Sequence, residues 1–177
     1  MIIKVCGMRE PQNIREVAAL AINWIGFIFY ERSKRFVERC PTEQQATDSE
    51  QLSPKKVGVF VNATIESMME KASTYKLDYL QLHGNESPED CHTLQKRGYS
   101  LIKAFPIATK EDFEKTREYE GRVDYFLFDT RCEGYGGSGK RFDWSILTGY
   151  KGETPFLLSG GIRPENAEAI RNFRHPR

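Results

Sequence analysis

The stretch that decides the fold covers residues 56–82 and reads KVGVFVNATIESMMEKASTYKLDYLQL. Its two short apolar runs, residues 56–61 and 78–82, have the length and composition of buried strands. Residues 65–75 between them carry apolar side chains at helical spacing. A strand, a helix and a second strand in this order predict a βα unit in a parallel sheet.

The same alternation continues on both sides of this stretch. Apolar runs predict further strands at residues 2–5, 24–30, 100–104, 123–128 and 156–158, and helical spacing predicts helices at residues 10–21, 42–52, 88–96, 110–119, 143–147 and 164–172. No low-complexity linker interrupts the 177 residues, so we expect one domain over residues 1–177. Seven βα units favour a (βα)8 TIM barrel that ends before its eighth strand and helix, with an open doubly wound sheet as the alternative.

Composition restricts the class of protein. Lys and Arg number 26 and Asp and Glu 25, so the net charge is +1 and offers no general attraction for nucleic acid or anionic lipid. Hydrophobic residues make up 39% of the chain, which is enough for a folded core. The longest uncharged stretch, residues 17–30, is too short to span a bilayer, and the N-terminus lacks the layout of a signal peptide. We therefore expect a cytoplasmic protein that binds neither nucleic acid nor membrane.

The cysteines and histidines offer little for a metal site. The four cysteines, at positions 6, 40, 91 and 132, form no CxxC pair, and only three histidines are present. In a reducing compartment four cysteines without such pairing are expected to be free thiols. We predict neither a metal nor a cofactor.

Polar residues collect where the predicted strands end, which is where βα barrels place their chemistry. Cys6 follows the first predicted strand, and Asp129 follows the apolar run 125–128. A thiolate at Cys6 would act as a base, although most unpaired cysteines are buried apolar groups. Asp129 borders a core, so we expect burial to raise its pKa and suit it to general acid catalysis; a helix cap or a loop ion pair is the alternative.

Four further features follow predicted strands in the same way. Residues 134–140 match the start of a Walker A loop, but Arg141 replaces the required Ser or Thr, so we expect a mobile loop over a small phosphorylated substrate or a plain connection. The turn Ser159-Gly160-Gly161 precedes a helix and could bind phosphate through backbone N–H groups. One arginine of the cluster Arg32, Lys34 and Arg35 could hold a carboxylate, although such a run of charges is usually a solvated surface. His83 taken alone is more typical of a structural hydrogen-bonding group.

With these residues in view, the sequence closely resembles the phosphoribosylanthranilate isomerase family of tryptophan biosynthesis. The matching segments are KVCGM at 4–8, GFIFY at 26–30, SKR at 33–35, VGVFVN at 57–62, LQLHG at 80–84, FDT at 128–130, YGGSGKRFDW at 135–144 and LSGGI at 158–162. The resemblance implies a (βα)8 barrel and a cofactor-free Amadori rearrangement of N-(5-phosphoribosyl)anthranilate, in a monomer or a homodimer.

The resemblance also assigns roles to residues. Asp129 corresponds to the general acid that opens the sugar ring, Cys6 to the general base at C2 of the sugar, and Arg35 to the arginine that binds the anthranilate carboxylate. Further substrate contacts are predicted at Gln81, His83, Gly136, Gly137 and Gly139, and phosphate contacts at Ser159, Gly160 and Gly161.

One departure from the family pattern concerns the last βα unit. The family has an eighth strand whose following loop completes the phosphate site, whereas this sequence ends at Arg177 after the seventh predicted helix. An alternative function is therefore a non-catalytic or impaired barrel that binds a phosphorylated ligand. A second alternative, another sugar-phosphate enzyme such as a synthase or an epimerase, would be expected to carry Lys/Glu or metal-binding Asp/His sets, which the strand ends lack.

Overall fold

A computed structural model describes residues 1–38, 54–130 and 143–172 of the chain, with side chains up to Ile170. Within them, seven strands form one sheet in the order β1-β2-β3-β4-β5-β6-β7. Every neighbouring pair is parallel. The strands are β1 (Lys4–Cys6), β2 (Trp24–Ile28), β3 (Lys55–Phe60), β4 (Tyr79–Leu82), β5 (Leu101–Ile107), β6 (Tyr125–Thr130) and β7 (Phe156–Leu158).

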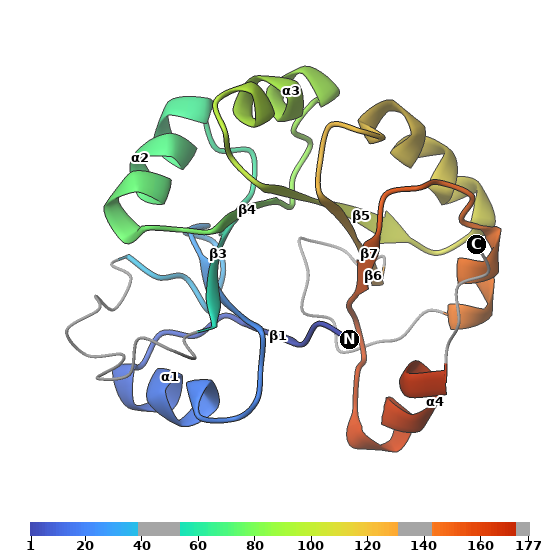
Figure 1. The fold of residues 1–177 in the computed structure, drawn as a ribbon, viewed down its shortest axis with the longest axis horizontal. Helices are drawn as coiled ribbons and strands as arrows, with labels where there is room; N and C mark the ends of the chain where they lie inside the picture. The colour runs from blue at the N-terminus through green and yellow to red at the C-terminus, as the bar shows by residue number, and fades with distance from the viewer. Residues whose placement is uncertain (39–53, 131–142, 173–177) are drawn as a thin grey trace.

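The helices lie outside the curved sheet, whose two edge strands among the described residues are β1 and β7 (Figure 1). They are α1 (Pro11–Ala18), α2 (Ile65–Tyr75), α3 (Pro88–Lys96), η2 (Lys110–Tyr119), η3 (Trp144–Gly149), η4 (Pro164–Asn166) and α4 (Ala167–Asn172). This arrangement is that of a βα barrel with seven strands in place, and it confirms the predicted fold class.

The predicted helices differ from the observed ones in detail. The segments η2, η3 and η4 are 3₁₀ helices, although the sequence predicted ordinary helices there. Apolar spacing fails to separate the two kinds of helix, because 3.0 and 3.6 residues per turn place similar sets of side chains on one face of a short helix. The helix predicted at 42–52 lies outside the described residues.

Local sequence explains where the regular helices begin. The hydroxyl of Thr64 accepts a hydrogen bond from the backbone N–H of Ser67 and starts α2. Ser87 and Asp90 form a reciprocal capping box at α3, with Pro88 in its first turn. These caps also fix the loops that follow β3 and β4, which belong to the site described below.

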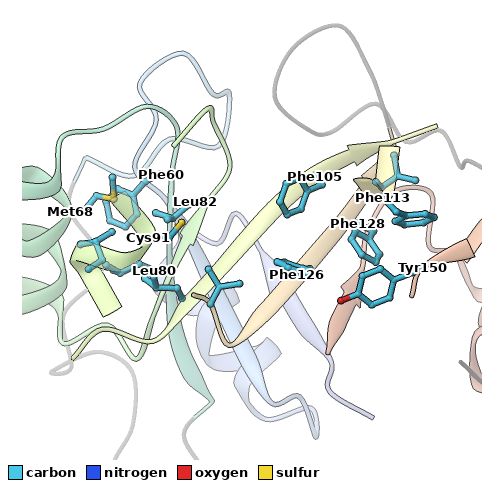
Figure 2. Packing of buried hydrophobic residues seen from close by; sticks show 14 of the residues in the cluster. Phe60, Met68, Leu80, Leu82, Cys91, Phe105, Phe113, Phe126, Phe128 and Tyr150 are labelled. Atoms are coloured by element: carbon cyan, nitrogen blue, oxygen red, sulfur yellow. The ribbon is translucent and has the colours of Figure 1, made fainter. Parts of the chain in front are cut away.

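Side chains alternate between the two faces of each strand, so the sheet has two apolar surfaces. The outer surface packs against the helices, as Figure 2 shows for Phe60, Met68 and Cys91. The inner surface carries a smaller apolar cluster of Trp24, Val57, Ile102, Ala104 and Leu127. Strand residues in step with this inner cluster therefore point into the barrel.

Candidate active site at the carboxyl ends of the strands

The two predicted catalytic residues lie at the same end and on the same face of the sheet. Cys6 is the last residue of β1, and Asp129 lies next to the last residue of β6. Because all strands are parallel, their carboxyl ends form one rim. Asp129 lies two residues after Leu127 of the inner cluster, so the two side chains are on the same face of β6. Cys6 pairs in register with Gly26, which lies two residues after Trp24 of the inner cluster, so Cys6 is on the inner face as well. Both side chains therefore point into the mouth of the barrel.

Two glycines make room around Cys6. A Cβ atom on Gly26 would lie 2.8 Å from Sγ of Cys6, so the thiol occupies space that any other residue at position 26 would fill. A Cβ atom on Gly7 would lie 2.7 Å from Cδ of Arg35, and Gly7 has a φ of +85°. The Arg35 side chain therefore lies against the backbone next to Cys6, which places a guanidinium beside the thiol-bearing residue.

Asp129 is buried, with 8% of its surface exposed. Its Oδ1 accepts a hydrogen bond of 2.9 Å from the Thr130 backbone, and its Oδ2 lies 3.6 Å from Nε2 of His83. Burial raises the pKa of Asp129, but its interactions with His83, Ser159 and Thr130 outweigh burial and hold the pKa below its ordinary value. The expectation of a raised pKa is therefore wrong, because polar partners from three strand ends surround the carboxylate.

The predicted phosphate turn lies against Asp129. A Cβ atom on Gly160 would lie 3.1 Å from Oδ1 of Asp129 and closer still to the Thr130 hydroxyl, so position 160 has no space for a side chain. Gly160 and Gly161 have φ values of +87° and +63°, which favour glycine at both positions. Backbone groups of this turn are thus available beside the carboxylate.

A cavity of about 900 Å³ extends from this rim along the opening between β1 and β7. Cys6, Ser159 and Gly160 contribute to its lining, together with apolar residues of both strands and of the N-terminus. Its size suits a small organic phosphate, since ligand pockets commonly measure roughly 300–1,000 Å³. The thiol and the glycine turn therefore border one space.

His83 and Gln81 form a pair on the inner face. Gln81 is 2% exposed, and its Nε2 lies 2.8 Å from Nδ1 of His83. Its Oε1 is buried without a hydrogen-bond partner among the described residues. The imidazole thus lies between the Gln81 carboxamide and the Asp129 carboxylate. The predicted substrate contacts of Gln81 and His83 stay predictions.

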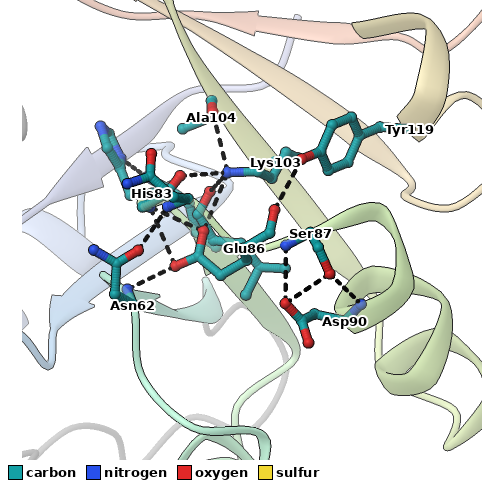
Figure 3. A network of polar contacts seen from close by, with 12 residues as sticks. Asn62, His83, Glu86, Ser87, Asp90, Lys103, Ala104 and Tyr119 are labelled. Carbon is teal, nitrogen blue, oxygen red and sulfur yellow. Dashed lines mark hydrogen bonds and ion pairs between the residues drawn. The ribbon is translucent and has the colours of Figure 1, made fainter. Parts of the chain in front are cut away.

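A buried ion pair that the sequence analysis missed holds the loop after β4 (Figure 3). Nζ of Lys103 lies 3.1 Å from Oε2 of Glu86 and donates to the Gly84 carbonyl oxygen at 2.7 Å. The Glu86 carboxylate also accepts from the backbone N–H groups of Asn62 and Gly84. The sequence feature that could have indicated this pair is the single lysine, Lys103, in the otherwise apolar strand β5. Its effect is to fix the segment that carries His83.

Other predicted features lie elsewhere or have no structural test. Gly136, Gly137 and Gly139, with the remainder of the loop at 131–142, lie outside the described residues. The described residues contain no group of three or more His, Cys, Asp or Glu side chains suited to a metal ion. In the same part of the chain, no helix has the length and apolarity needed to cross a membrane.

Comparison with known proteins identifies the family. The family model described as N-(5'phosphoribosyl)anthranilate (PRA) isomerase matches residues 3–176. A relative from Phocaeicola vulgatus named N-(5'-phosphoribosyl)anthranilate isomerase is 49% identical over 177 residues, which cover 99% of this chain and 82% of the relative. One from Caldanaerobacter subterraneus with the same name is 42% identical over 97% of this chain and 83% of its own length.

Solved structures agree with this result. Phosphoribosyl anthranilate isomerase from Thermotoga maritima superposes with a TM-score of 0.76 at 32% identity, covering 96% of this chain and 82% of that protein. A phosphoribosyl anthranilate isomerase in complex with reduced 1-(o-carboxyphenylamino)-1-deoxyribulose 5-phosphate superposes with a TM-score of 0.73 at 28% identity, covering 96% of this chain and 80% of that protein. The chain therefore belongs to the N-(5'-phosphoribosyl)anthranilate isomerase family of barrel enzymes.

Proposed function

We propose that the chain catalyses the Amadori rearrangement of N-(5-phosphoribosyl)anthranilate to 1-(2-carboxyphenylamino)-1-deoxyribulose 5-phosphate, acting in the cytoplasm. Membership in the isomerase family of tryptophan biosynthesis supports the reaction class. The observation that carries the mechanism is the common location of Cys6 and Asp129 on the inner face of one rim. The reaction needs an acid and a base around a single sugar, and this rim offers both.

Asp129 is the group that transfers a proton to the furanose ring oxygen. The C1–O bond then breaks, its electron pair goes to the oxygen, and a Schiff base forms between C1 and the anthranilate nitrogen. The carboxylate is held by the Thr130 N–H, so it keeps its position while its protonation state changes.

Cys6 is the base that removes the proton from C2 of the Schiff base. The resulting enolamine tautomerises to the ketone product. Only the thiolate of cysteine accepts protons efficiently. The space over Gly26 lets the sulfur face the cavity, which supports this role.

Arg35 and the glycine turn bind the two charged ends of the substrate. The guanidinium is a planar donor that matches the anthranilate carboxylate. It lies beside Cys6, because its Nη1 donates to the Cys6 carbonyl oxygen. Ser159, Gly160 and Gly161 offer the phosphate a turn without bulky side chains, and Gly136, Gly137 and Gly139 are proposed to contact the substrate from their loop.

The test follows the loss of phosphoribosylanthranilate fluorescence in Cys6→Ala and Asp129→Asn. Each variant is expected to lose at least about 10²-fold in kcat, the smallest effect typical of general acid–base catalysis. Cys91→Ala and Asp124→Asn are matched controls that leave kcat unchanged, since Cys91 is buried in the outer core and Asp124 binds the Leu101 backbone. Undiminished turnover in Cys6→Ala or Asp129→Asn would refute the role of that residue.

The open side of the barrel favours a second candidate, a binder of phosphorylated ligands with little or no turnover. The cavity between β1 and β7 reaches Ser159 and Gly160, so the proposed phosphate turn borders an opening. Tight binding of the reduced product analogue by wild-type protein, with no measurable turnover, would support this candidate. Efficient turnover by the wild-type protein would exclude it.

A further inference from the structure

The acid end of the site presents a chemical problem. The proposed ring opening needs a proton at Asp129, yet the surroundings of Asp129 hold its pKa below the ordinary value. At neutral pH the carboxylate of the free protein is therefore ionised and carries no proton to deliver. A neighbouring group that gains a proton near neutral pH can supply it.

His83 is the neighbouring group placed to do so. Its Nε2 faces Oδ2 of Asp129 at 3.6 Å, and both side chains are mostly buried, with 17% and 12% exposed. Histidine is the side chain that ordinarily gains and loses a proton near neutral pH. The other charged groups that the described residues place around it are Lys103 and Glu86, which are paired with each other behind its loop.

Gln81 shows how His83 can change its protonation state without losing a hydrogen bond. As placed, the amide Nε2 of Gln81 donates to an unprotonated Nδ1 of His83. Because Oε1 of Gln81 has no other partner among the described residues, a half-turn of the carboxamide breaks no further hydrogen bond. That half-turn presents Oε1 to a protonated Nδ1. The same buried residue thus fits both neutral imidazole and imidazolium.

We propose that His83 is a positioning residue that stores the proton delivered through Asp129, and that Gln81 keeps its hydrogen bond to Nδ1 in both protonation states of His83. The inference rests on the proposed role of Asp129 in ring opening. In that step the imidazolium gives its Nε2 proton to Asp129, Asp129 gives a proton to the ring oxygen, and His83 is left neutral. The isomerisation consumes no net proton, so the proton that the Cys6 thiol later releases to solvent balances the one that His83 regains.

Two measurements test the proposal. The first is ¹⁵N NMR of the histidine side chains in the unliganded protein across pH, with His83 assigned by its loss in His83→Gln. We expect His83 to carry protons on both nitrogens at acid pH and to lose one of them as pH rises. In Gln81→Glu the added carboxylate favours imidazolium, so this loss moves to higher pH. A His83 that stays neutral throughout the active pH range would overturn the proposal.

The second measurement is the pH profile of kcat. We expect kcat of the wild-type protein to fall as pH rises and His83 loses its proton. His83→Gln is expected to lower kcat at least about 10²-fold and to abolish this fall at alkaline pH, with a smaller effect on KM. In Gln81→Glu the alkaline fall in kcat is expected to move to higher pH, in parallel with the NMR titration. His92→Gln is the matched control, because His92 is exposed on α3. An unchanged kcat and pH profile in His83→Gln would overturn the proposal, and this variant keeps the test valid if Gln81→Glu fails to fold.

The outcomes separate this inference from the proposed function. Full activity in Asp129→Asn would refute the catalytic role of Asp129 itself. Loss of activity in Asp129→Asn, combined with full activity in His83→Gln, would leave the proposed function in place and refute only the storage of the proton on His83.

Discussion

Nη1 of Arg35 donates a hydrogen bond of 2.9 Å to the backbone carbonyl oxygen of Cys6. Arg35 lies in the segment that follows β2, whereas Cys6 is the last residue of β1, and the bond fixes the guanidinium next to the proposed base. A carboxylate held by this guanidinium would therefore be close to the thiol. The proposed carboxylate site and the proposed base are thus held next to each other before substrate arrives.

Arg35→Met is expected to raise KM for the carboxylate-bearing substrate about 10–100-fold, which corresponds to losing a hydrogen bond to a charged group worth about 1.5–3 kcal/mol. Steady-state kinetics would measure this, with kcat changing less than KM. Arg32→Met is the matched control, because Arg32 is exposed three residues earlier. An unchanged KM in Arg35→Met would contradict the assignment.

Gly26→Ala is expected to displace the thiol of Cys6, since the new Cβ would lie 2.8 Å from Sγ. We expect kcat to fall at least about 10-fold, because small misplacements of reacting groups cost large factors in rate. The alkylation rate of Cys6, followed by peptide mass spectrometry, should change in the same variant. Equal alkylation rates in Gly26→Ala and wild type would show that the thiol had not moved.

Lys103→Met is expected to destabilise the fold by about 3–5 kcal/mol, because it leaves the Glu86 carboxylate buried without its cation. Urea unfolding would measure this loss. The double variant Lys103→Met/Glu86→Gln removes the uncompensated charge and should recover part of the stability.

The matched control for that experiment is the pair Arg117–Glu114 on η2, whose side chains are 75% and 61% exposed. Arg117→Met is expected to change stability by less than about 0.5 kcal/mol, the effect typical of an exposed pair. Equal losses in Lys103→Met and Arg117→Met would show that burial of the Lys103–Glu86 pair has no energetic consequence.

Asp129 is expected to make stability depend on pH at the acid end. Its pKa in the folded protein lies below the ordinary value of 3.8, so the folded state binds its proton less tightly than the unfolded state does. The contribution to stability is therefore complete above the unfolded pKa and is lost as pH falls through the folded value. Urea unfolding between neutral pH and acid pH should show a smaller loss in Asp129→Asn than in wild type. Parallel losses in the two proteins would contradict this.

The sequence predicted the rim of the site because two regularities were sufficient. Parallel strands end at one edge, and alternate residues share a face, so Cys6 and Asp129 could be placed together from their positions in apolar runs. The protonation of Asp129 could not be predicted, because it depends on His83 from β4 and Ser159 from β7. The Lys103–Glu86 pair was missed for the same reason: a single lysine in an apolar strand indicates a buried partner without naming it. The contact between Gly26 and Cys6 required the register of β1 and β2.

The opening between β1 and β7 links assembly to chemistry. Among the described residues, each of these strands has a sheet neighbour on one side, and together they border the cavity that contains Cys6, Ser159 and Gly160. A polypeptide that bridged the opening would meet two rows of peptide groups and, at the carboxyl ends of the strands, the proposed catalytic and phosphate-binding groups. Mechanical closure of the ring and exclusion of bulk water from the reacting sugar would therefore happen in one event.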